Sequence, residues 1–421
     1  MKVLWITNIV FPEALASISK DSTLKSSGGW MLGAASAFTK LNDISLAIAS
    51  CSNLVKDLTF IKGKEINHYI LPIAGSNTKV NKKYEPFWKI INDDFNPDIV
   101  HIHGTEYSHG LAYIEACGAD KVVVSIQGLT SIFERYYYGG LSSGQVFKSL
   151  TLRDFGRGTL FKGHRDFVKR GKYEKEMLLK SHHIIGRTEW DKAHVWSVNP
   201  DATYHFCNET LREEFYDAEK WDYSKCQLHT IFASTAGFPI KGFHQLLKAM
   251  PLILRAYPDA SIRVAGLDIT RSNSGLKGKL IRTGYGKYLS GLINRYGLKE
   301  KVTFTGSLDA KEMKKEYLQA NVFVCPSSIE NSPNSLCEAQ ILGVPNISSY
   351  VGGTMTLTSD SSMGELYRFE EVEMLAWKIC KMFSESQRFD NSEMIHNANL
   401  RHNREVNANK LLKIYQQIRN A

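Results

Sequence analysis

The 421-residue sequence has no uninterrupted run of about 18 apolar residues, the length that a membrane-spanning helix needs. Its seven cysteines are scattered, odd in number and without C-x-x-C spacing. This pattern argues against a zinc site or a disulfide framework and favours a reducing compartment. The first 14 residues carry Thr7 and Asn8 inside an apolar run and have no small-residue cleavage site, so they predict a buried strand. We therefore expect a cytoplasmic protein.

Two phosphate-binding motifs are also missing. The nearest approach to G-x-G-x-x-G, Gly284 to Gly291, has Leu289 where the third glycine belongs, and no Walker A sequence occurs. These absences argue against a dinucleotide-dependent enzyme and against a P-loop.

The composition is that of an ordinary globular protein with an excess of basic residues. Hydrophobic residues make up 43% and charged residues 23%, and Lys plus Arg exceed Asp plus Glu by 52 − 43 = 9. The excess favours anionic partners, but no nucleic-acid module is visible and the basic residues are spread rather than striped. Basic and apolar residues interleave from Phe161 to Lys180. This segment is either a solvated helix with a core-facing stripe or a surface that touches an anionic membrane.

Short β-rich runs alternate with amphipathic stretches along the whole chain, which predicts parallel sheets with crossover helices. In the first half the predicted strands are Val3–Thr7, Ile44–Ala49, Asn67–Leu71, Asp98–His103, Lys121–Ile126, His183–Gly186 and Thr203–Phe206. In the second half the predicted strands lie in the run after Leu228 and at Ser261–Ala265, Val302–Thr305, Val322–Cys325 and Pro345–Ser349. The predicted helices of this half are Phe243–Ala256, Lys287–Tyr296, Glu312–Gln319 and Ser335–Leu342.

This alternation predicts two doubly wound α/β domains, because single cores stop growing near about 250–300 residues. We place the first domain at residues 1–212 and the second at 213–404, with Leu211–Tyr223 as the connection. Met394–Ile418 is a polar helical tail that we expect to return across the first domain, so residues 405–421 are assigned to that domain. Ligands of such sheets bind at the carboxyl ends of the strands, so a cleft between the two domains is the expected site.

The segment from Cys325 to Pro345 carries the clearest chemistry. A strand ends at Cys325 and Pro333 stands where a first helical turn would begin. The amides of Asn334, Ser335 and Leu336 are then predicted to be unpaired donors at a positive helix end, a seat for a pyrophosphate.

Two glutamates flank this predicted anion site. Glu338 lies one turn into the helix, within reach of ribose hydroxyls, and Glu330 lies on the loop towards a sugar. The alternative is structural: Glu338 complements the helix dipole and Glu330 is a solvated loop acid. The strands predicted before and after the segment, with Gly352 and Gly353 beyond, favour the functional interpretation.

Glu330-x7-Glu338 followed by A-x-x-x-G-V-P resembles the signature of the retaining GT-B glycosyltransferases of the family 4 type, also called glycosyl transferases group 1. That family includes relatives of sucrose synthase and of bacterial mannosyltransferases. Gly28-Gly29, Lys241-Gly242 and Val302–Met313 fall where the family has matching segments. The resemblance covers nearly the whole chain and is strong over residues 228–353. It implies a GT-B fold, two Rossmann-like domains facing a cleft.

The resemblance also implies roles for individual residues. Gly28 and Gly29 would bring amides to the distal phosphate, Lys241 would neutralise it, Glu338 would hold the ribose, and Glu330 would contact the sugar. The loop Gly306-Ser307-Leu308 would receive the base.

Two positions depart from the family pattern. Many relatives have an arginine about six residues before the lysine, where this chain has Thr235. Arg187 is the candidate substitute, although a surface pairing with Glu189 or Asp191 is equally compatible with the sequence. At the second position, relatives often have a histidine where this chain has Gln127. The residues that we expect to serve catalysis are Glu330, Lys241, His103 and Gln127.

Three histidines, His101, His103 and His109, follow one another closely. A parallel strand places His101 and His103 on one face, but no carboxylate follows at ligand spacing, so we expect no metal site. His103 is predicted at the carboxyl end of its strand, and His109 near the acceptor.

The function expected from the resemblance is retaining, metal-independent transfer of a sugar from a nucleotide-sugar to a glycan or lipid-linked acceptor, with no cofactor. The chain contains no Asp-x-Asp pair of the kind that metal-using glycosyltransferases carry. Two alternatives remain open: a nucleotide-sugar epimerase of the same architecture, and a non-catalytic carbohydrate- or nucleic-acid-binding protein. We expect the enzyme at the inner face of a membrane, in peripheral contact with anionic lipid and not with nucleic acid.

Overall fold

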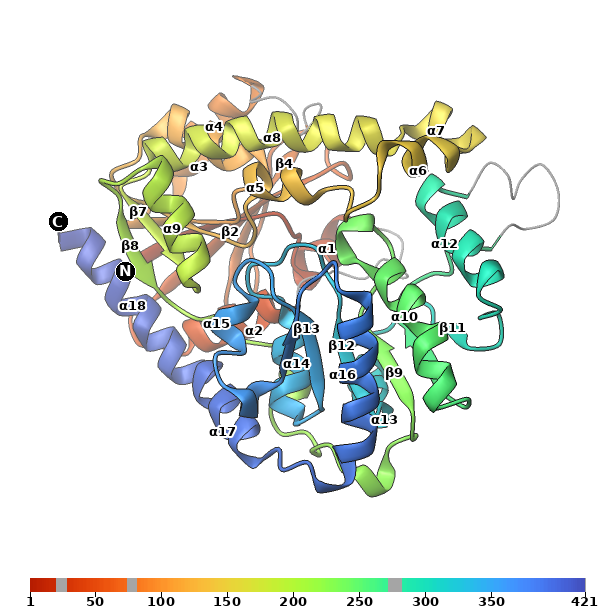
Figure 1. Cartoon of the computed structure of the whole chain (residues 1–421). Helices are drawn as coiled ribbons and strands as arrows, with labels where there is room; N and C mark the ends of the chain where they lie inside the picture. The colour runs from red at the N-terminus through yellow and green to blue at the C-terminus, as the bar shows by residue number, and fades with distance from the viewer. Residues whose placement is uncertain (20–28, 74–81, 272–281, 421) are drawn as a thin grey trace. The chain divides into compact units, whose positions relative to one another are not determined.

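The computed structural model describes residues 1–19, 29–73, 82–271 and 282–420 and divides into two compact units (Figure 1). The first unit comprises Met1–Glu134, Asp166–Glu213 and His402–Ala421. The second unit comprises Arg135–Arg165 and Glu214–Arg401. Each unit has its own sheet and its own hydrophobic core.

The first unit is built on an eight-stranded sheet in the order β3-β4-β2-β1-β5-β6-β7-β8. All neighbouring strands are parallel except β3 and β4, which are antiparallel. The strands are β1 Lys2–Thr7, β2 Ser45–Ser52, β3 Thr59–Ile61, β4 Asn67–Pro72, β5 Ile99–His103, β6 Val122–Ser125, β7 His183–Gly186 and β8 Thr203–Phe206. The seven strands predicted in this half are present, and only β3, three residues long, was missed. So short a strand carries no measurable periodicity.

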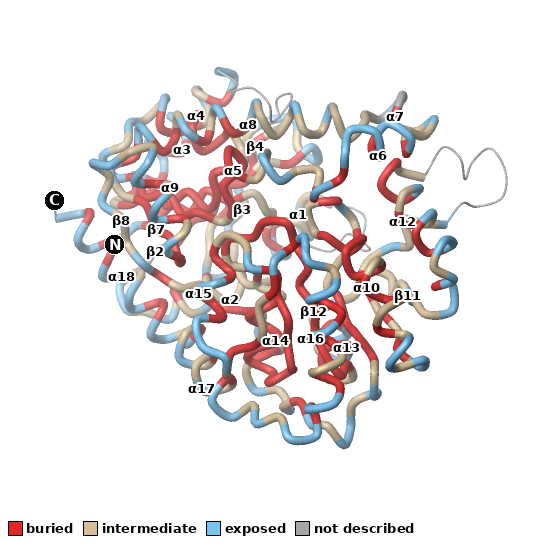
Figure 2. The backbone as a smooth tube through the Cα atoms, viewed as in Figure 1, coloured by how far each residue is buried: buried red, intermediate tan, exposed pale blue. Residues whose placement is uncertain are grey.

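Helices cover both faces of this sheet, as the alternation of side chains along a strand requires. Leu4 and Ile6 of β1 pack on the face of α3 and α4, whereas Val3 and Trp5 pack on the face of α2 and α18. Figure 2 shows the central strands buried and the outer sides of the helices exposed, whereas the edge strands β3 and β8 contain no fully buried residue. The helices are α1 Pro12–Ile18, α2 Gly29–Thr39, α3 Glu85–Phe95, α4 Ser108–Cys117, α5 Thr130–Phe133, α8 Leu160–Lys180, α9 Glu189–Val198 and α18 Arg404–Asn420. The start of α8, up to Arg165, is grouped with the second unit.

The second unit is built on a six-stranded parallel sheet in the order β11-β10-β9-β12-β13-β14. Its strands are β9 Thr230–Ala233, β10 Ser261–Val264, β11 Val302–Phe304, β12 Val322–Cys325, β13 Asn346–Ser349 and β14 Glu365–Tyr367. Its helices are α6 Ser143–Lys148, α7 Leu152–Arg157, α10 Phe243–Ala256, α12 Gly284–Arg295, α13 Ala310–Gln319, α14 Asn334–Leu342, α15 Thr354–Leu357, α16 Val372–Glu385 and α17 Ser392–Arg401. The edge strand β14 was not predicted. Within the described residues, no helix is both long and apolar enough to cross a membrane.

Residues 135–165 differ from their predicted place. They are predicted in the first domain, whereas the structure groups them with the second unit. Leu141 and Val146 join the core of α10 and α12, and His244 of α10 bonds the Gly139 carbonyl oxygen through Nε2 at 2.9 Å. The sequence does not indicate this placement, because the side chains that hold residues 135–165 lie about a hundred residues further along the chain.

The C-terminal tail also differs from its prediction as one helix. It forms α17 in the second unit and α18 in the first, with the break at His402 and Asn403. α18 packs on α2 and brings Tyr415 into the core, where its hydroxyl accepts a hydrogen bond of 3.0 Å from Trp5 Nε1 and bonds His101 Nδ1.

We expect Tyr415→Phe to lower the free energy of unfolding of the first unit by about 1–3 kcal/mol, because it leaves the buried Trp5 N–H without an acceptor. Urea denaturation followed by tryptophan fluorescence measures the loss. Tyr136→Phe is the control, since Tyr136 lies in the second unit and is 43% exposed, and it should change the free energy of unfolding of the first unit by less than about 0.5 kcal/mol. Equal stability of the two variants would show that this hydroxyl is not needed.

Candidate active site

The carboxyl edge of the second sheet is formed by turns in close backbone contact. The turn Pro239–Lys241 follows β9 and ends at Gly242, which has φ +67° and stands at the N-cap of α10. A Cβ on Gly242 would lie 1.7 Å from the carbonyl oxygen of Pro326, in the loop after β12. The Ser328 amide donates to the Ile240 carbonyl oxygen at 2.8 Å, so the turn and the loop are held together.

Lys241 and Glu330 form an ion pair at this edge. Lys241 Nζ lies 2.5 Å from Glu330 Oε1, which also accepts a hydrogen bond of 2.7 Å from Ser327 Oγ. Burial disfavours the charged amine, but the attraction of Glu330 and their hydrogen bond outweigh it and raise the pKa of Lys241. The lysine therefore stays protonated, and it remains partly exposed while Glu330 is buried.

The backbone of Glu330 is fixed by Gly352 and Gly353. The Gly353 amide donates to the Glu330 carbonyl oxygen at 3.0 Å. Gly352 has φ +52°, and a Cβ there would lie 2.0 Å from the same oxygen. Only glycine fits so close to another backbone in this conformation.

The start of α14 differs in one respect from its prediction. Pro333 is the N-cap residue, and the Leu336 amide donates to its carbonyl oxygen at 3.0 Å. Among the described residues, the amides of Asn334 and Ser335 have no acceptor, so two of the three predicted donors stay open. The first turn therefore keeps the partial positive charge that attracts an anion.

Glu338 lies one turn further along α14 and is buried. The hydroxyl of Tyr317 donates to the Ser335 carbonyl oxygen at 2.9 Å and lies 3.5 Å from Glu338 Oε2. Tyr317, which belongs to α13, therefore connects Glu338 to the first turn of α14.

The predicted base-binding loop lies at the end of β11. Gly306, at φ +83°, forms a two-way bridge with Gly266 after β10, with N–H···O distances of 2.9 and 3.2 Å. Leu308 follows it and is half-buried. The loop, Lys241, Glu330 and α14 therefore all stand at the carboxyl edge of one parallel sheet.

In the first unit, Gly29 is the first residue of α2, and a Cβ there would lie 3.1 Å from Arg212 Cγ. Gly28 lies outside the described residues.

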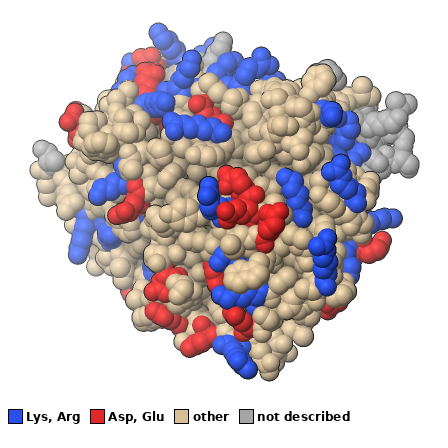
Figure 3. Space-filling model, in the orientation of Figure 1, with Lys and Arg blue, Asp and Glu red and all other residues tan. Residues whose placement is uncertain are grey.

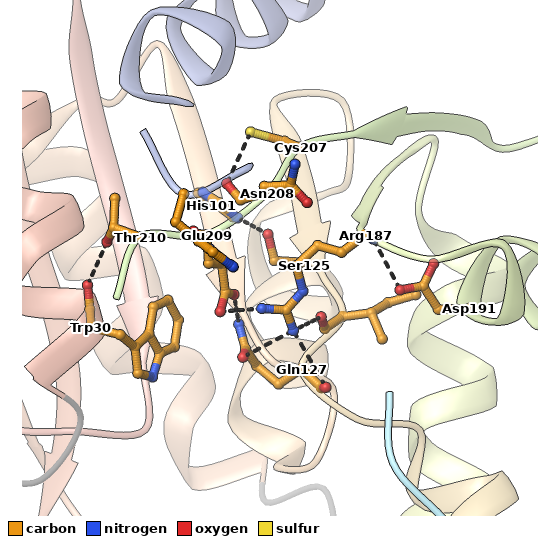
Figure 4. A network of polar contacts seen from close by, with 12 residues as sticks. Trp30, His101, Ser125, Gln127, Arg187, Asp191, Cys207, Asn208, Glu209 and Thr210 are labelled. Carbon is orange, nitrogen blue, oxygen red and sulfur yellow. Dashed lines mark hydrogen bonds and ion pairs between the residues drawn. The ribbon is translucent and has the colours of Figure 1, made fainter. Parts of the chain in front are cut away.

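Arg187 has a partner that the sequence did not indicate (Figure 4). It is buried at the end of β7, forms an ion pair with Glu209, and donates to the Ile126 carbonyl oxygen at 3.1 Å. Gln127 Nε2 donates to the other oxygen of Glu209. The alternative prediction, a side-chain pair of Arg187 with Glu189 or Asp191, is wrong. Asp191 accepts a hydrogen bond of 3.0 Å from the backbone amide of Arg187. A role for Arg187 on a diphosphate would require the pair with Glu209 to open.

The histidines are buried and neutral. Burial lowers the pKa of His103 to about 3 and that of His109 to about 4. His101 and His103 stack with ring centroids 3.8 Å apart, and the ring nitrogens of His101 bond Tyr415 and Ser125. No group of three His, Cys, Asp or Glu side chains in the described part of the chain is placed to hold a metal ion.

Three residues of these contacts were not predicted from the sequence: Ser327, Ser328 and Glu209. The two serines lie between a strand end and Glu330, which was a usable signal. Glu209 follows β8 directly, but nothing in the sequence joins it to Arg187 or Gln127.

The chain matches the family described as Glycosyl transferases group 1 over residues 227–402. An uncharacterised glycosyltransferase of Methanocaldococcus jannaschii is 29% identical over 145 residues, which span 34% of this chain and only 33% of that protein.

Solved structures match the whole chain and identify its fold. Sucrose-phosphate synthase from Thermosynechococcus elongatus superimposes with a TM-score of 0.71, at 17% identity over 99% of this chain and 98% of that one. An Anabaena protein, HepE, in complex with UDP and glucose gives a TM-score of 0.65, at 14% identity over 99% of both chains. The two Rossmann-like units thus have the GT-B glycosyltransferase fold.

We expect Gly242→Ala to destabilise the second unit by more than Gly297→Ala does. Both glycines have nearly the same positive φ, +67° and +66°, but only at Gly242 does a Cβ meet another atom within 4 Å. The control therefore reports the left-handed strain alone, about 1–2 kcal/mol. Thermal unfolding of both variants measures the difference, and equal losses would contradict the contact with Pro326.

Proposed function

We propose that this protein transfers a sugar from a nucleotide-sugar to a glycan or lipid-linked acceptor, with retention of anomeric configuration and without a metal or cofactor. The observation that carries the proposal is the ion pair Lys241–Glu330 beside the open amides of Asn334 and Ser335, inside a group 1 glycosyltransferase domain. The acceptor class remains an inference from the family resemblance.

The donor would lie along the carboxyl edge of the second sheet. Its diphosphate takes the start of α14 and the exposed side of Lys241, because both carry positive charge. Glu338 then holds the ribose, and the loop from Gly306 to Leu308 receives the base. The UDP and glucose named for the Anabaena structure support a nucleotide-sugar as the donor.

In the transfer step, an acceptor hydroxyl oxygen forms the new bond to the anomeric carbon while the bond to the diphosphate breaks. The departing diphosphate takes the hydroxyl proton on the same face, so the configuration is retained and no protein nucleophile is needed. Lys241 stabilises the leaving group, and Glu330, fixed by Ser327 and Gly353, faces the sugar as positive charge develops.

Contact with an anionic membrane is part of the proposal. Five basic residues of α8 are exposed at helical spacing: Lys162, Arg165, Lys169, Lys172 and Lys175. Figure 3 shows Lys and Arg gathered on the upper part of the visible face, where Figure 1 labels α8. Met177 and Leu178 of the same helix are buried, so the core-facing stripe of the sequence analysis is also present.

Substitution of the three charged residues should separate their roles. Glu338→Gln should mainly weaken nucleoside diphosphate affinity, because a charge-assisted hydrogen bond contributes about 1.5–3 kcal/mol. Glu330→Gln should lower turnover more than binding, since its contact matters most in the transition state. Lys241→Ala should lower both turnover and nucleoside diphosphate affinity.

Steady-state kinetics and calorimetric binding of UDP to each variant measure these effects. Glu316→Gln is the control: Glu316 is a buried glutamate of the same unit, paired with Arg263 at 2.6 Å, and its loss should affect stability without changing UDP affinity. The assignment is wrong if Glu330→Gln keeps normal turnover while Glu338→Gln loses it at unchanged affinity. Incubation with donor alone separates transfer from epimerisation, which would yield an epimer.

Transfer should persist in EDTA, because Lys241 and the α14 amides supply the positive charge that a divalent ion supplies elsewhere. The measurement is initial rate after dialysis against EDTA, with and without added magnesium or manganese. Activity abolished by EDTA and restored by either ion would overturn metal independence.

A further inference from the structure

Residues 135–165 concentrate positive charge. They carry six basic residues and one acid, so they contribute five of the nine positive charges that the chain has in excess. The acid is Asp154, whose buried carboxylate accepts hydrogen bonds of 2.8 and 2.9 Å from the amide and the hydroxyl of Thr151. Four of the basic residues are exposed, and among the described residues none of the four has an acidic partner: Arg135, Lys148, Lys162 and Arg165. The surface of this segment is therefore cationic, with no exposed acid of its own.

Two large apolar side chains are exposed on the same segment. Phe147, at the end of α6, is 68% exposed, and Leu152, at the start of α7, is 61% exposed. Figure 1 shows both helices beside the start of α8, which carries Lys162 and Arg165. Neighbouring apolar side chains that are exposed and rimmed by polar residues mark a surface for a partner.

The backbone that presents these side chains is held in place by the second unit. Val146, next to Phe147, packs in the core of that unit. Lys287 Nζ of α12 donates to the carbonyl oxygens of Lys148 and Leu150 at 2.9 and 3.1 Å, between the two helices. Phe147 and Leu152 are therefore exposed on an anchored connection, so little ordering is needed before they enter a partner.

An anionic bilayer satisfies both features of this surface. Its headgroups attract Lys and Arg, and its acyl boundary takes up exposed Phe and Leu side chains. A nucleic acid would use the positive charge and could stack a base on Phe147, but it offers nothing to Leu152. The two apolar side chains together therefore favour a bilayer.

We propose that Phe147 and Leu152 insert into an anionic bilayer while the exposed basic residues of the segment 135–165 contact its headgroups. The second unit then carries the insertion point of the membrane contact, in addition to the basic face of α8. Delivery of the enzyme to a lipid-linked acceptor rests on the function proposed above. Docking itself does not, because it requires neither donor nor transfer.

The test is cosedimentation of the full-length protein with phosphatidylcholine vesicles prepared with and without phosphatidylglycerol. The wild type should bind only the vesicles that contain the anionic lipid. The double variant Phe147→Ser, Leu152→Ser should bind about tenfold more weakly or worse, because the apolar area that enters the bilayer is lost. Phe147→Trp should bind like the wild type, since tryptophan is favoured at the membrane interface.

A matched control is the double variant Trp196→Ser, Leu400→Ser. These two side chains are 68% and 59% exposed, much like Phe147 and Leu152, but they lie on α9 and α17, so vesicle binding should stay at the wild-type level. Independent evidence comes from the charges: the triple variant Lys148→Glu, Lys162→Glu, Arg165→Glu should bind about a hundredfold more weakly or worse, at about fivefold per charge.

The proposal is overturned if the wild type does not bind anionic vesicles, if it binds polyuridylate instead, or if Phe147→Ser, Leu152→Ser binds vesicles like the control. UDP binding, measured by calorimetry, should be the same in the wild type and all variants, because every substituted side chain is exposed and lies outside the candidate active site. Vesicle binding without UDP binding would remove the proposed transfer reaction and leave the docking surface standing. UDP binding without vesicle binding would do the reverse.

Discussion

The candidate active site depends on backbone contacts that only glycine permits. Gly242 brings the Lys241 turn against the Pro326 carbonyl oxygen, and Gly352 lies against the carbonyl oxygen of Glu330. Both have positive φ, so a side chain would meet conformational strain and collision together. The separation of Lys241 and Glu330 is therefore set by the backbone at the sheet edge. Glu330 is in addition buried and bonded to Ser327, so its carboxylate is held in place before any ligand binds.

The two units use buried polar groups differently. In the second unit, Lys241 is charged and partly exposed beside open helix amides, an arrangement suited to an anion. In the first unit, Arg187 is neutralised by Glu209, and burial keeps His103 and His109 uncharged. Burial raises the pKa of Glu209 despite the opposing effect of Arg187. The carboxyl edges of the two sheets thus differ in charge: a protonated lysine is partly exposed at one, and a neutralised arginine lies beside neutral histidines at the other.

Residues 135–165 lie in the first half of the sequence but pack in the second unit. Gly139 packs against the turn that carries Lys241, since a Cβ there would lie 2.2 Å from the Pro239 carbonyl oxygen. Ser328 Oγ donates to the Tyr136 carbonyl oxygen at 3.1 Å, two residues before Glu330. Residues 135–165 therefore support the backbone of the candidate site in the second unit and help to position Lys241 and Glu330.

The sequence by itself determined the alternation of strands and helices and the segment from Cys325 to Pro345 that carries Glu330 and Glu338. Periodicity and turn residues are local signals, so they can be read without the fold. Only the tertiary structure decided that Lys241 pairs with Glu330, that Glu209 engages Arg187, and that Tyr415 reaches His101. Those partners are 89, 22 and 314 residues apart, and the burial that makes their contacts specific exists only after the chain has folded.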